Sequence, residues 1–179
     1  MALGKHCAIL QIIGHQNSGK TTLMEKLIKK ASEENYRVGT IKHHGHGGAP
    51  DHEMISKDSY RHSKAGSVIA GVEGGGVLQL NARQNNWQLS DLVNLYQSFS
   101  INLILVEGYK KEQFPKVVMI RDETDVPLLK QSANIKCVIC WNDCIADQLD
   151  IPVFNIEDEL AYIEYIIHIA GDQHETGTV

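Results

Sequence analysis

An apolar run from Ala8 to Ile13 leads directly into the sequence GHQNSGKTT, and this junction restricts the possible folds tightly. The spacing of Gly14, Gly19, Lys20 and Thr21 is that of a phosphate-binding loop between a strand and a helix. The two glycines permit the backbone angles by which several N–H groups point inward. The positive N-terminal end of the following helix favours an anion at the same point. A glycine-rich turn without a ligand is the alternative, and the strand before the loop argues against it.

Two side chains of this loop carry chemistry. Lys20 is expected to reach the β- and γ-phosphates of a nucleotide, and the Thr21 hydroxyl is expected to ligate Mg²⁺. The predicted nucleotide-binding residues of the loop are Gly14, His15, Gln16, Asn17, Ser18, Gly19, Lys20, Thr21 and Thr22. The chain is therefore predicted to bind a nucleoside triphosphate together with Mg²⁺.

Segments typical of strands alternate with segments typical of helices along the chain. The patterns predict strands over residues 8–13, 38–42, 102–106, 117–120 and 136–140, a hairpin over 67–81, and helices over 20–34, 57–65, 90–98 and 156–170. Ser90 is the expected N-cap of the third helix. This alternation predicts a three-layer α/β fold like that of P-loop NTPases, with a largely parallel central sheet and a small β-hairpin insertion.

The bulk properties indicate one nucleotide-binding domain over residues 1–171, followed by a polar C-terminal tail over 172–179. The net charge of −5 argues against a nucleic-acid partner. No apolar stretch reaches the roughly 18 residues of a membrane helix, and residues 1–6 lack the apolar core of a signal peptide. We therefore expect a cytoplasmic protein without a membrane partner. Its four cysteines are expected to be free thiols.

The Cys137-Val138-Ile139-Cys140 segment looks like a metal-binding CxxC pair, but it lies in an apolar run. Residues three apart on a strand point to opposite faces of the sheet. These two thiols are therefore not expected to hold one metal ion.

Glu107 closes the apolar strand predicted over residues 102–106. In parallel α/β sheets, ligands sit at the carboxyl ends of the strands, so Glu107 should face the phosphate loop. A carboxylate there is suited to hold Mg²⁺ directly or through water, or to orient an attacking water. The alternative is an acid that simply faces solvent.

The segment from Lys42 to Glu53 is rich in glycine and histidine and has no clear periodicity. The main hypothesis is a switch segment that becomes ordered over the γ-phosphate. Asp51 or Glu53 would supply its acid, and Lys42 or His43 its positive charge. A transition-metal site built from the histidines and a solvated loop without a direct role are the alternatives.

The residues alone do not determine the nucleobase. The Asn-Lys-x-Asp pattern of many GTPases is absent, and Asn142-Asp143 is a weak substitute for it. An aspartate there could accept hydrogen bonds from guanine, but the same dipeptide is ordinary turn chemistry. Asn142 and Asp143 are candidate guanine contacts.

With these motifs in view, the chain resembles the molybdopterin-guanine dinucleotide biosynthesis adaptor family, MobB. The resemblance rests on four blocks in order, which span about the first two-thirds of the chain: Gly14 to Thr22, Ile41 to His44, Lys57 to Gly66 and Leu103 to Lys110. Similar proteins tend to have Asp-x-x-Gly-Lys-Asp-Ser before the tyrosine, where this chain has Glu53 to Ser59. The switch acid is thus Glu53 by alignment or Asp51 by chemistry.

The resemblance implies a GTP-binding protein with weak GTPase activity that is usually dimeric. Such a protein would assist the guanylyltransferase MobA in attaching GMP to molybdenum-bound molybdopterin. The alternative function is a small-molecule kinase that uses the same loop. A kinase usually adds an arginine lid over the transferred phosphoryl group, and none of the four arginines of this chain lies in an obvious lid. This favours the adaptor.

Overall fold

The computed structural model describes residues 7–44, 57–142 and 149–176. Its strands are β1 (Ala8–Gly14), β2 (Val38–Lys42), β3 (Ile69–Gly74), β4 (Val77–Ala82), β5 (Leu103–Glu107), β6 (Lys116–Ile120), β7 (Ile135–Cys140) and β8 (Val153–Asn155). Its helices are α1 (Lys20–Glu33), α2 (Lys57–Lys64), α3 (Leu89–Tyr96), α4 (Pro127–Lys130) and α5 (Glu159–Thr176).

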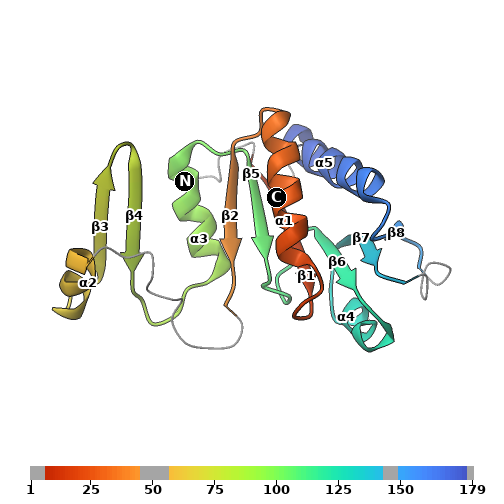
Figure 1. Cartoon of the computed structure of the whole chain (residues 1–179), viewed down its shortest axis with the longest axis horizontal. Coiled ribbons are helices and arrows are strands. Elements are labelled where there is room, and N and C mark those ends of the chain that lie inside the picture. Colours follow the sequence, from red (N-terminus) through yellow and green to blue (C-terminus); the bar gives the residue numbers. More distant parts are fainter. Residues whose placement is uncertain (1–6, 45–56, 143–148, 177–179) are drawn as a thin grey trace.

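Six strands form one parallel sheet in the order β2-β5-β1-β6-β7-β8 (Figure 1). Helices α1 and α5 pack on one face of this sheet, and α3 and α4 pack on the other. The predicted three-layer α/β fold is therefore confirmed, and so is its β-hairpin, formed by β3 and β4.

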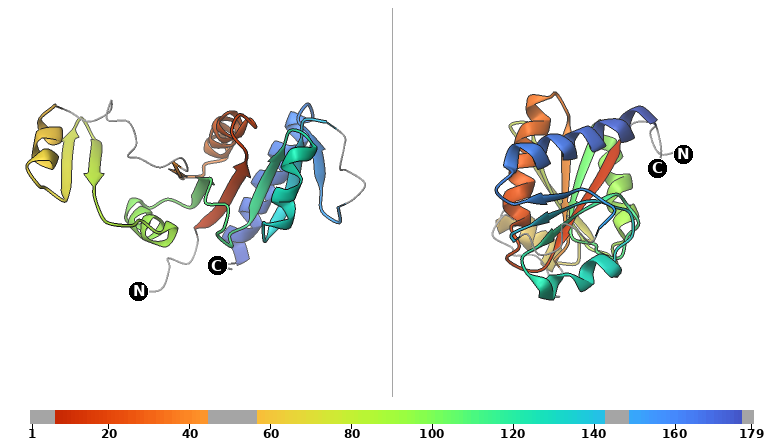
Figure 2. Two further views of the ribbon diagram at one scale, coloured as in Figure 1. Left: turned by 90° about the horizontal axis from the view of Figure 1, so that it is seen from below. Right: turned by 90° about the vertical axis from the view of Figure 1, so that its right-hand side faces the viewer.

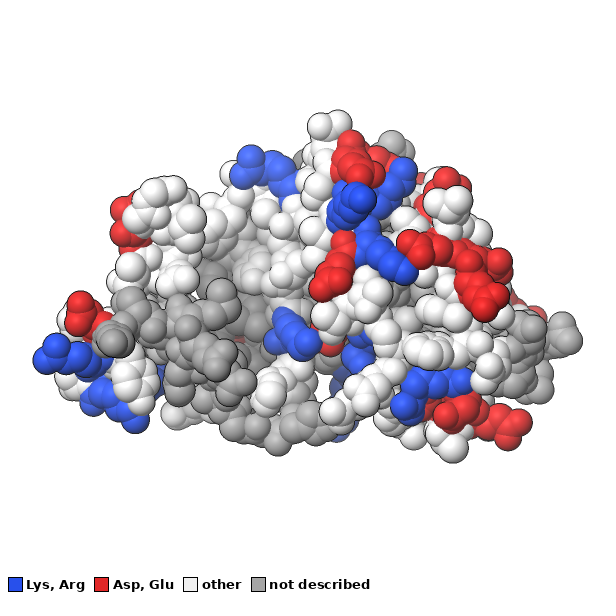
Figure 3. All heavy atoms as spheres, in the orientation of Figure 1, with Lys and Arg blue, Asp and Glu red and all other residues white. Residues whose placement is uncertain are grey.

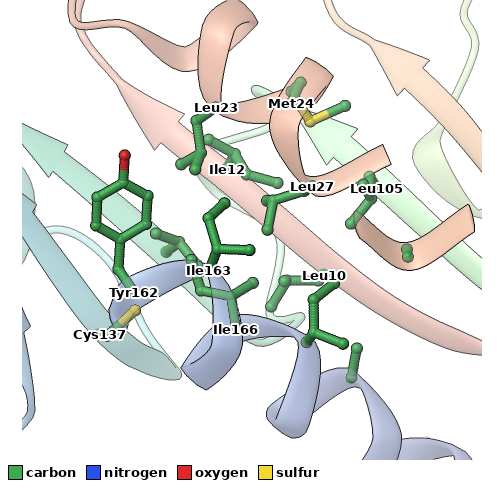
Figure 4. Close-up of a cluster of buried hydrophobic side chains, with 14 of the residues drawn as sticks. Leu10, Ile12, Leu23, Met24, Leu27, Leu105, Cys137, Tyr162, Ile163 and Ile166 are labelled. Atoms are coloured by element: carbon green, nitrogen blue, oxygen red, sulfur yellow. The ribbon is translucent and has the colours of Figure 1, made fainter. Parts of the chain in front are cut away.

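The strict alternation of side chains along the strands explains the three layers. In β1, Leu10 and Ile12 point toward α1 and α5, whereas Ile9 points toward α3 and Ile13 toward α4. Figure 4 shows the first of these clusters, where side chains of α1 and α5 meet those of β1. Both faces of the central strands are therefore covered, which fits their nearly continuous apolar sequences.

The same alternation separates the two buried cysteines of β7. Cys137 belongs to the cluster under α5, and Cys140 to the cluster under α4. The two thiols therefore lie on opposite faces of the sheet, as predicted. Burial raises the pKa of the Cys137 thiol to about 12. Cys7, Cys137 and Cys140 form no disulfide within the described residues, and Cys144 lies outside them.

The hairpin projects away from the six-stranded sheet beyond α3 (Figures 1 and 2). Its strands pair from Ile69 with Ala82 to Gly74 with Val77. Helix α2 lies against β3 on one face, where Ala70 is buried and Asn81 Nδ2 donates to Ser63 Oγ at 3.4 Å. The hairpin is therefore covered by its own helix on one side.

Three expectations from the sequence differ from the structure. The N-cap of α3 is Gln88 rather than Ser90, because the buried Leu89 must already lie in the helix. The Asp91 carboxylate accepts from the Gln88 N–H at 3.0 Å and caps this end.

The last helix, α5, begins at Glu159 and continues to Thr176, because residues 153–155 form β8 beside β7. Helix α4 was not expected. Of the helices described, none is both long and apolar enough to cross a membrane.

Candidate functional site

The loop between β1 and α1 lies at the carboxyl end of the central strand. Gly14 is required there, because a Cβ on it would lie 2.5 Å from Ser18 Oγ. Asn17 and Gly19 have positive φ angles of 60° and 91°, which turn the chain into the helix. The first amides of α1 have no acceptor within the helix. The loop therefore has the shape expected of a phosphate cradle.

Lys20 begins α1 and bends back over this loop. Its ammonium donates to the His15 carbonyl at 2.5 Å and to Ser18 Oγ at 3.4 Å. Desolvation lowers the pKa of Lys20; the nearby Glu107 opposes this shift, while Lys110, Lys42 and Arg121 add to it. Lys42, Lys110 and Arg121 thus lie near enough to Lys20 to affect its charge, and positive charge in this region favours an anion.

Glu107 ends β5 beside the loop, in register with Ile12 of β1 and Lys42 of β2. It is 9% exposed, so it does not simply face solvent. Its Oε2 accepts from Thr21 Oγ1 at 3.5 Å and forms an ion pair with Lys42 Nζ at 3.2 Å. The structure therefore brings together Thr21, Lys42 and Glu107, which the sequence placed at one crevice.

The oxygen donors of Thr21 and Glu107 fit Mg²⁺. A threonine hydroxyl and a carboxylate are hard oxygen ligands, and Mg²⁺ usually takes one or two of these together with waters and substrate phosphates. Within the described ranges, no group of three or more His, Cys, Asp or Glu side chains could hold a metal ion by itself. Thr21 and Glu107 would hold Mg²⁺ only together with a bound phosphate.

His43 follows β2 and lies over the turn after β5. Its N–H donates to the Glu107 carbonyl at 2.9 Å, and its ring lies 4.5 Å from that of Tyr109. Gly108 has a φ of 98°, and a Cβ on it would lie 3.1 Å from His43 Cβ. A larger residue than glycine at position 108 would therefore crowd His43. His43 therefore belongs to the same edge of the site as Glu107.

The ends of β6 and β7 form the other edge of the site. The Trp141 indole N–H donates to the Ser18 carbonyl at 3.2 Å, so this ring packs against the phosphate loop. Asn142 donates through Nδ2 to the Arg121 carbonyl at 3.2 Å. The candidate guanine contact Asn142 thus lies near the loop, but its amide is bonded to the backbone.

Some of the predicted site residues lie outside the described part of the chain. These are Asp51 and Glu53 of the histidine-rich segment and Asp143 after β7. The Thr22 side chain is exposed on α1, and His15, Gln16 and Asn17 are exposed on the loop.

Sequence reasoning missed Asp125, which is almost fully buried beside the loop. Arg121 donates to both of its carboxylate oxygens, at 3.0 and 3.2 Å, and His15 Nε2 lies 3.9 Å from Oδ1. The Arg121 hydrogen bonds hold the pKa of Asp125 below its ordinary value. An arginine and an aspartate lie four residues apart after an apolar strand, and this spacing was the sequence signal for such an ion pair.

Sequence reasoning also missed Gln11 and Lys116, which are fully buried on the α3 and α4 face of the sheet. Gln11 interrupts an otherwise apolar strand. That interruption was the signal for a buried polar contact.

A loop of this form after the first strand of a parallel sheet, with Thr21 and Glu107 at its mouth, defines a phosphate-loop α/β protein. The chain belongs to the MobB family. Residues 9–141 match the family described as molybdopterin guanine dinucleotide synthesis protein B.

Similar proteins cover nearly the whole chain. A probable molybdopterin-guanine dinucleotide biosynthesis adapter protein of Bacillus subtilis is 41% identical over 173 residues, which cover 96% of this chain and 99% of that protein. The adapter protein of Haemophilus influenzae is 37% identical, with 89% of each chain covered. The crystal structure of Bacillus subtilis MobB matches with a TM-score of 0.79 and 38% identity, covering 90% of this chain and 96% of that chain.

Proposed function

We propose that this protein binds GTP with Mg²⁺, hydrolyses it slowly, and acts as an adaptor for the guanylyltransferase MobA, which attaches GMP to molybdopterin. The observation that carries the proposal is the convergence of Lys20, Thr21 and Glu107 at one loop. The adaptor role follows the names of its relatives, which are molybdopterin-guanine dinucleotide biosynthesis adapter proteins.

Some of the site residues would bind the phosphates, and others would bind the metal ion. Lys20 exchanges its contacts with the loop for the β- and γ-phosphates. Thr21 and Glu107 would hold Mg²⁺, and the ion would supply positive charge beside the same phosphates. Lys42 pairs with Glu107, and its largely exposed ammonium would contact the γ-phosphate of a bound nucleotide.

Slow hydrolysis follows from the state of the arginine nearest the loop. The Arg121 guanidinium donates to both carboxylate oxygens of Asp125, so these donors are not free for a transferred phosphoryl group. Phosphate-loop proteins gain roughly 10³–10⁵ in turnover when an arginine reaches that group. A slow GTPase keeps its nucleotide until a partner docks, which suits an adaptor better than a kinase.

The protein forms a homodimer through the hairpin in this proposal. The face of the hairpin opposite α2 carries Ile69, Leu78 and Leu80, which are 55%, 50% and 46% exposed. In the view of Figure 3, charged side chains gather over α1, α5 and α2. A two-stranded hairpin is marginal alone, so a second hairpin on this apolar face would stabilise both.

The test is a titration of the protein with MobA in the presence of GTP, GDP or no nucleotide, at fixed Mg²⁺. We expect binding that strengthens with GTP, and a GTP turnover well below the enzyme median of about 10 s⁻¹. Rapid phosphoryl transfer to a small acceptor, without MobA binding under any condition, would replace the adaptor with the kinase.

A further inference from the structure

Lys116 is a fully buried lysine, and its ammonium bonds to neutral oxygens. It donates to Gln11 Oε1 at 2.6 Å, to the Phe114 carbonyl at 3.0 Å and to the Glu112 carbonyl. An ammonium has three donors, and all three are used here. Desolvation lowers the pKa of Lys116, and the negative charge of Glu112 opposes this. The lysine thus binds the connection between β5 and β6 from inside.

Gln11 extends this contact to the end of β5. Because its Oε1 accepts from an ammonium, its Nε2 must be the donor toward the other side. That nitrogen donates to the Gly108 carbonyl at 3.0 Å and to the Tyr109 carbonyl at 2.8 Å. Lys116 and Gln11, which we call the buried pair, therefore hold five carbonyl or amide oxygens in one network.

The topology explains why the chain needs this pair. Residues 108–115 connect β5 to β6 across β1 without a helix, because β6 begins at the level of Gln11, near the point where β5 ends. The connection must therefore turn sharply directly after Glu107. Gly108 and Tyr109 have positive φ angles of 98° and 53°. The tyrosine conformation is uncommon for a large side chain and persists only where the surroundings hold it.

We propose that Lys116 and Gln11 are positioning residues for the nucleotide site. They fix the turn at Gly108 and Tyr109, and this turn places the Glu107 carboxylate toward Thr21 on the opposite face of the sheet. The same turn holds the Tyr109 ring against His43 and carries Lys110, which lies close enough to Lys20 to affect its pKa. Because Glu107 is the proposed Mg²⁺ ligand, loss of the buried pair should also weaken Mg²⁺ binding. That effect rests on the proposed function, whereas the effect on the turn does not.

The test uses the double variant Gln11→Leu/Lys116→Met and the single variant Gln11→Glu. The double variant replaces both partners of the Lys116–Gln11 hydrogen bond by apolar side chains of similar size, but four backbone carbonyls lose a donor, so we expect some loss of stability. Gln11→Glu keeps an acceptor for Lys116 but loses the two N–H donors to the turn. Val138→Ala is the control, because it removes buried volume on the same face of the sheet without touching the network.

The first measurement is made without nucleotide. Proton NMR of the His43 imidazole, assigned with His43→Gln, reports the ring-current shift from Tyr109. We expect this shift to be lost in the double variant and in Gln11→Glu, and to remain in Val138→Ala even though its Tm falls. Persistence of the shift in the two network variants would overturn the proposal, whether or not the protein binds GTP.

The second measurement is the Mg²⁺ concentration that gives half-maximal GTP binding. Loss of an outer partner of a metal ligand costs about 10- to 100-fold in metal affinity, so we expect an increase of about tenfold in the network variants. GTP affinity without Mg²⁺ should stay near the wild-type value, because the phosphate loop is untouched. A parallel loss of both affinities would assign the pair a general structural role instead. Wild-type protein without affinity for GTP would refute the proposed function and leave the NMR result to decide on the pair.

Discussion

The Thr21 hydroxyl at the start of α1 and the Glu107 carboxylate at the end of β5 lie 3.5 Å apart, although 86 residues separate them in the sequence. The parallel register of β1 and β5 brings them together, because both strands end at the same edge of the sheet. The carboxylate is paired with Lys42 and largely buried. A cation that enters with a phosphate would therefore meet this carboxylate at the mouth of the loop.

Substitution of Lys20 by alanine should abolish most of the affinity for GTP without unfolding the protein. Its ammonium contacts the loop and not the apolar core. Hydrogen bonds to charged groups contribute about 1.5–3 kcal/mol, so the dissociation constant should rise by roughly 10- to 100-fold. Calorimetry with GTP and Mg²⁺ measures this, with Lys29→Ala on the exposed side of α1 as the matched control. Equal affinities in the two variants would refute a phosphate-binding role for the loop.

Glu107→Gln should impair hydrolysis and the response to Mg²⁺ more than it impairs nucleotide binding. The amide keeps the shape of the side chain but loses the charge that attracts the ion or its water. We expect at least about tenfold more Mg²⁺ to be needed for half-maximal turnover, because loss of even an outer partner of a metal ligand costs about 10- to 100-fold in metal affinity. Turnover measured across a Mg²⁺ series checks this. Identical curves for the variant and the wild-type protein would show that Glu107 has no metal role.

The elements that could be predicted from the sequence are those whose residue pattern matches their burial in the fold. The loop at Gly14 to Thr21, the central strands and the acid at Glu107 follow from spacing and from the rule that parallel strands end together. Helix α4 and strand β8 were missed, because each is too short for a periodic pattern to develop.

The contacts that position the site were harder to predict than the site itself. Lys116 precedes an apolar run and looks like an ordinary charged residue at a strand end, yet the short crossover from β5 buries it. Arg121 and Asp125 are common residues of a turn, and their mutual contact and the burial of the acid become evident only in the structure. Such partners depend on the exact level at which neighbouring strands start, and the sequence of one chain does not specify that level.

Trp141 should report nucleotide binding by its fluorescence. Its indole N–H donates to the Ser18 carbonyl, and the ring lies close to Gly19. Phosphate in the loop should change the electrostatic field at the Trp141 ring. The other tryptophan, Trp87, directly precedes α3 and is not part of the loop, so its emission should not respond. GTP with Mg²⁺ should change the emission of the Trp87→Phe variant and leave that of Trp141→Phe unchanged. The reverse pattern would show that the loop and Trp141 are not coupled.

Asp125 should make the protein less stable in acid. Its pKa is lowered in the folded state by hydrogen bonds from Arg121. Below its ordinary pKa of about 4, the unfolded chain takes up this proton before the folded chain does, so stability falls as the pH drops toward the folded pKa. Asp125→Asn should lower Tm by several degrees at pH 7 and reduce the loss of Tm between pH 5 and pH 3. Thermal unfolding at these values measures both. A variant with the full acid sensitivity of the wild-type protein would exclude Asp125 as its source.

Leu80→Asp should separate the proposed homodimer while leaving the six-stranded sheet intact. Leu80 lies on the face of the hairpin opposite α2, beside Gly71, where a Cβ would lie 3.0 Å from its side chain. A carboxylate there would have to be buried without a partner in the proposed interface, which is strongly unfavourable. Sedimentation should therefore give the monomer mass of 19.9 kDa for the variant and twice that mass for the wild-type protein.

The matched control is Gln79→Glu, because neighbouring residues of β4 point to opposite faces of the hairpin. This variant adds the same charge on the side of α2 and should remain dimeric. Near-ultraviolet circular dichroism of the sheet and its helices should be alike in both variants. If Leu80→Asp remains a dimer, the two copies meet elsewhere. If Gln79→Glu also dissociates, added charge rather than the apolar face controls the association.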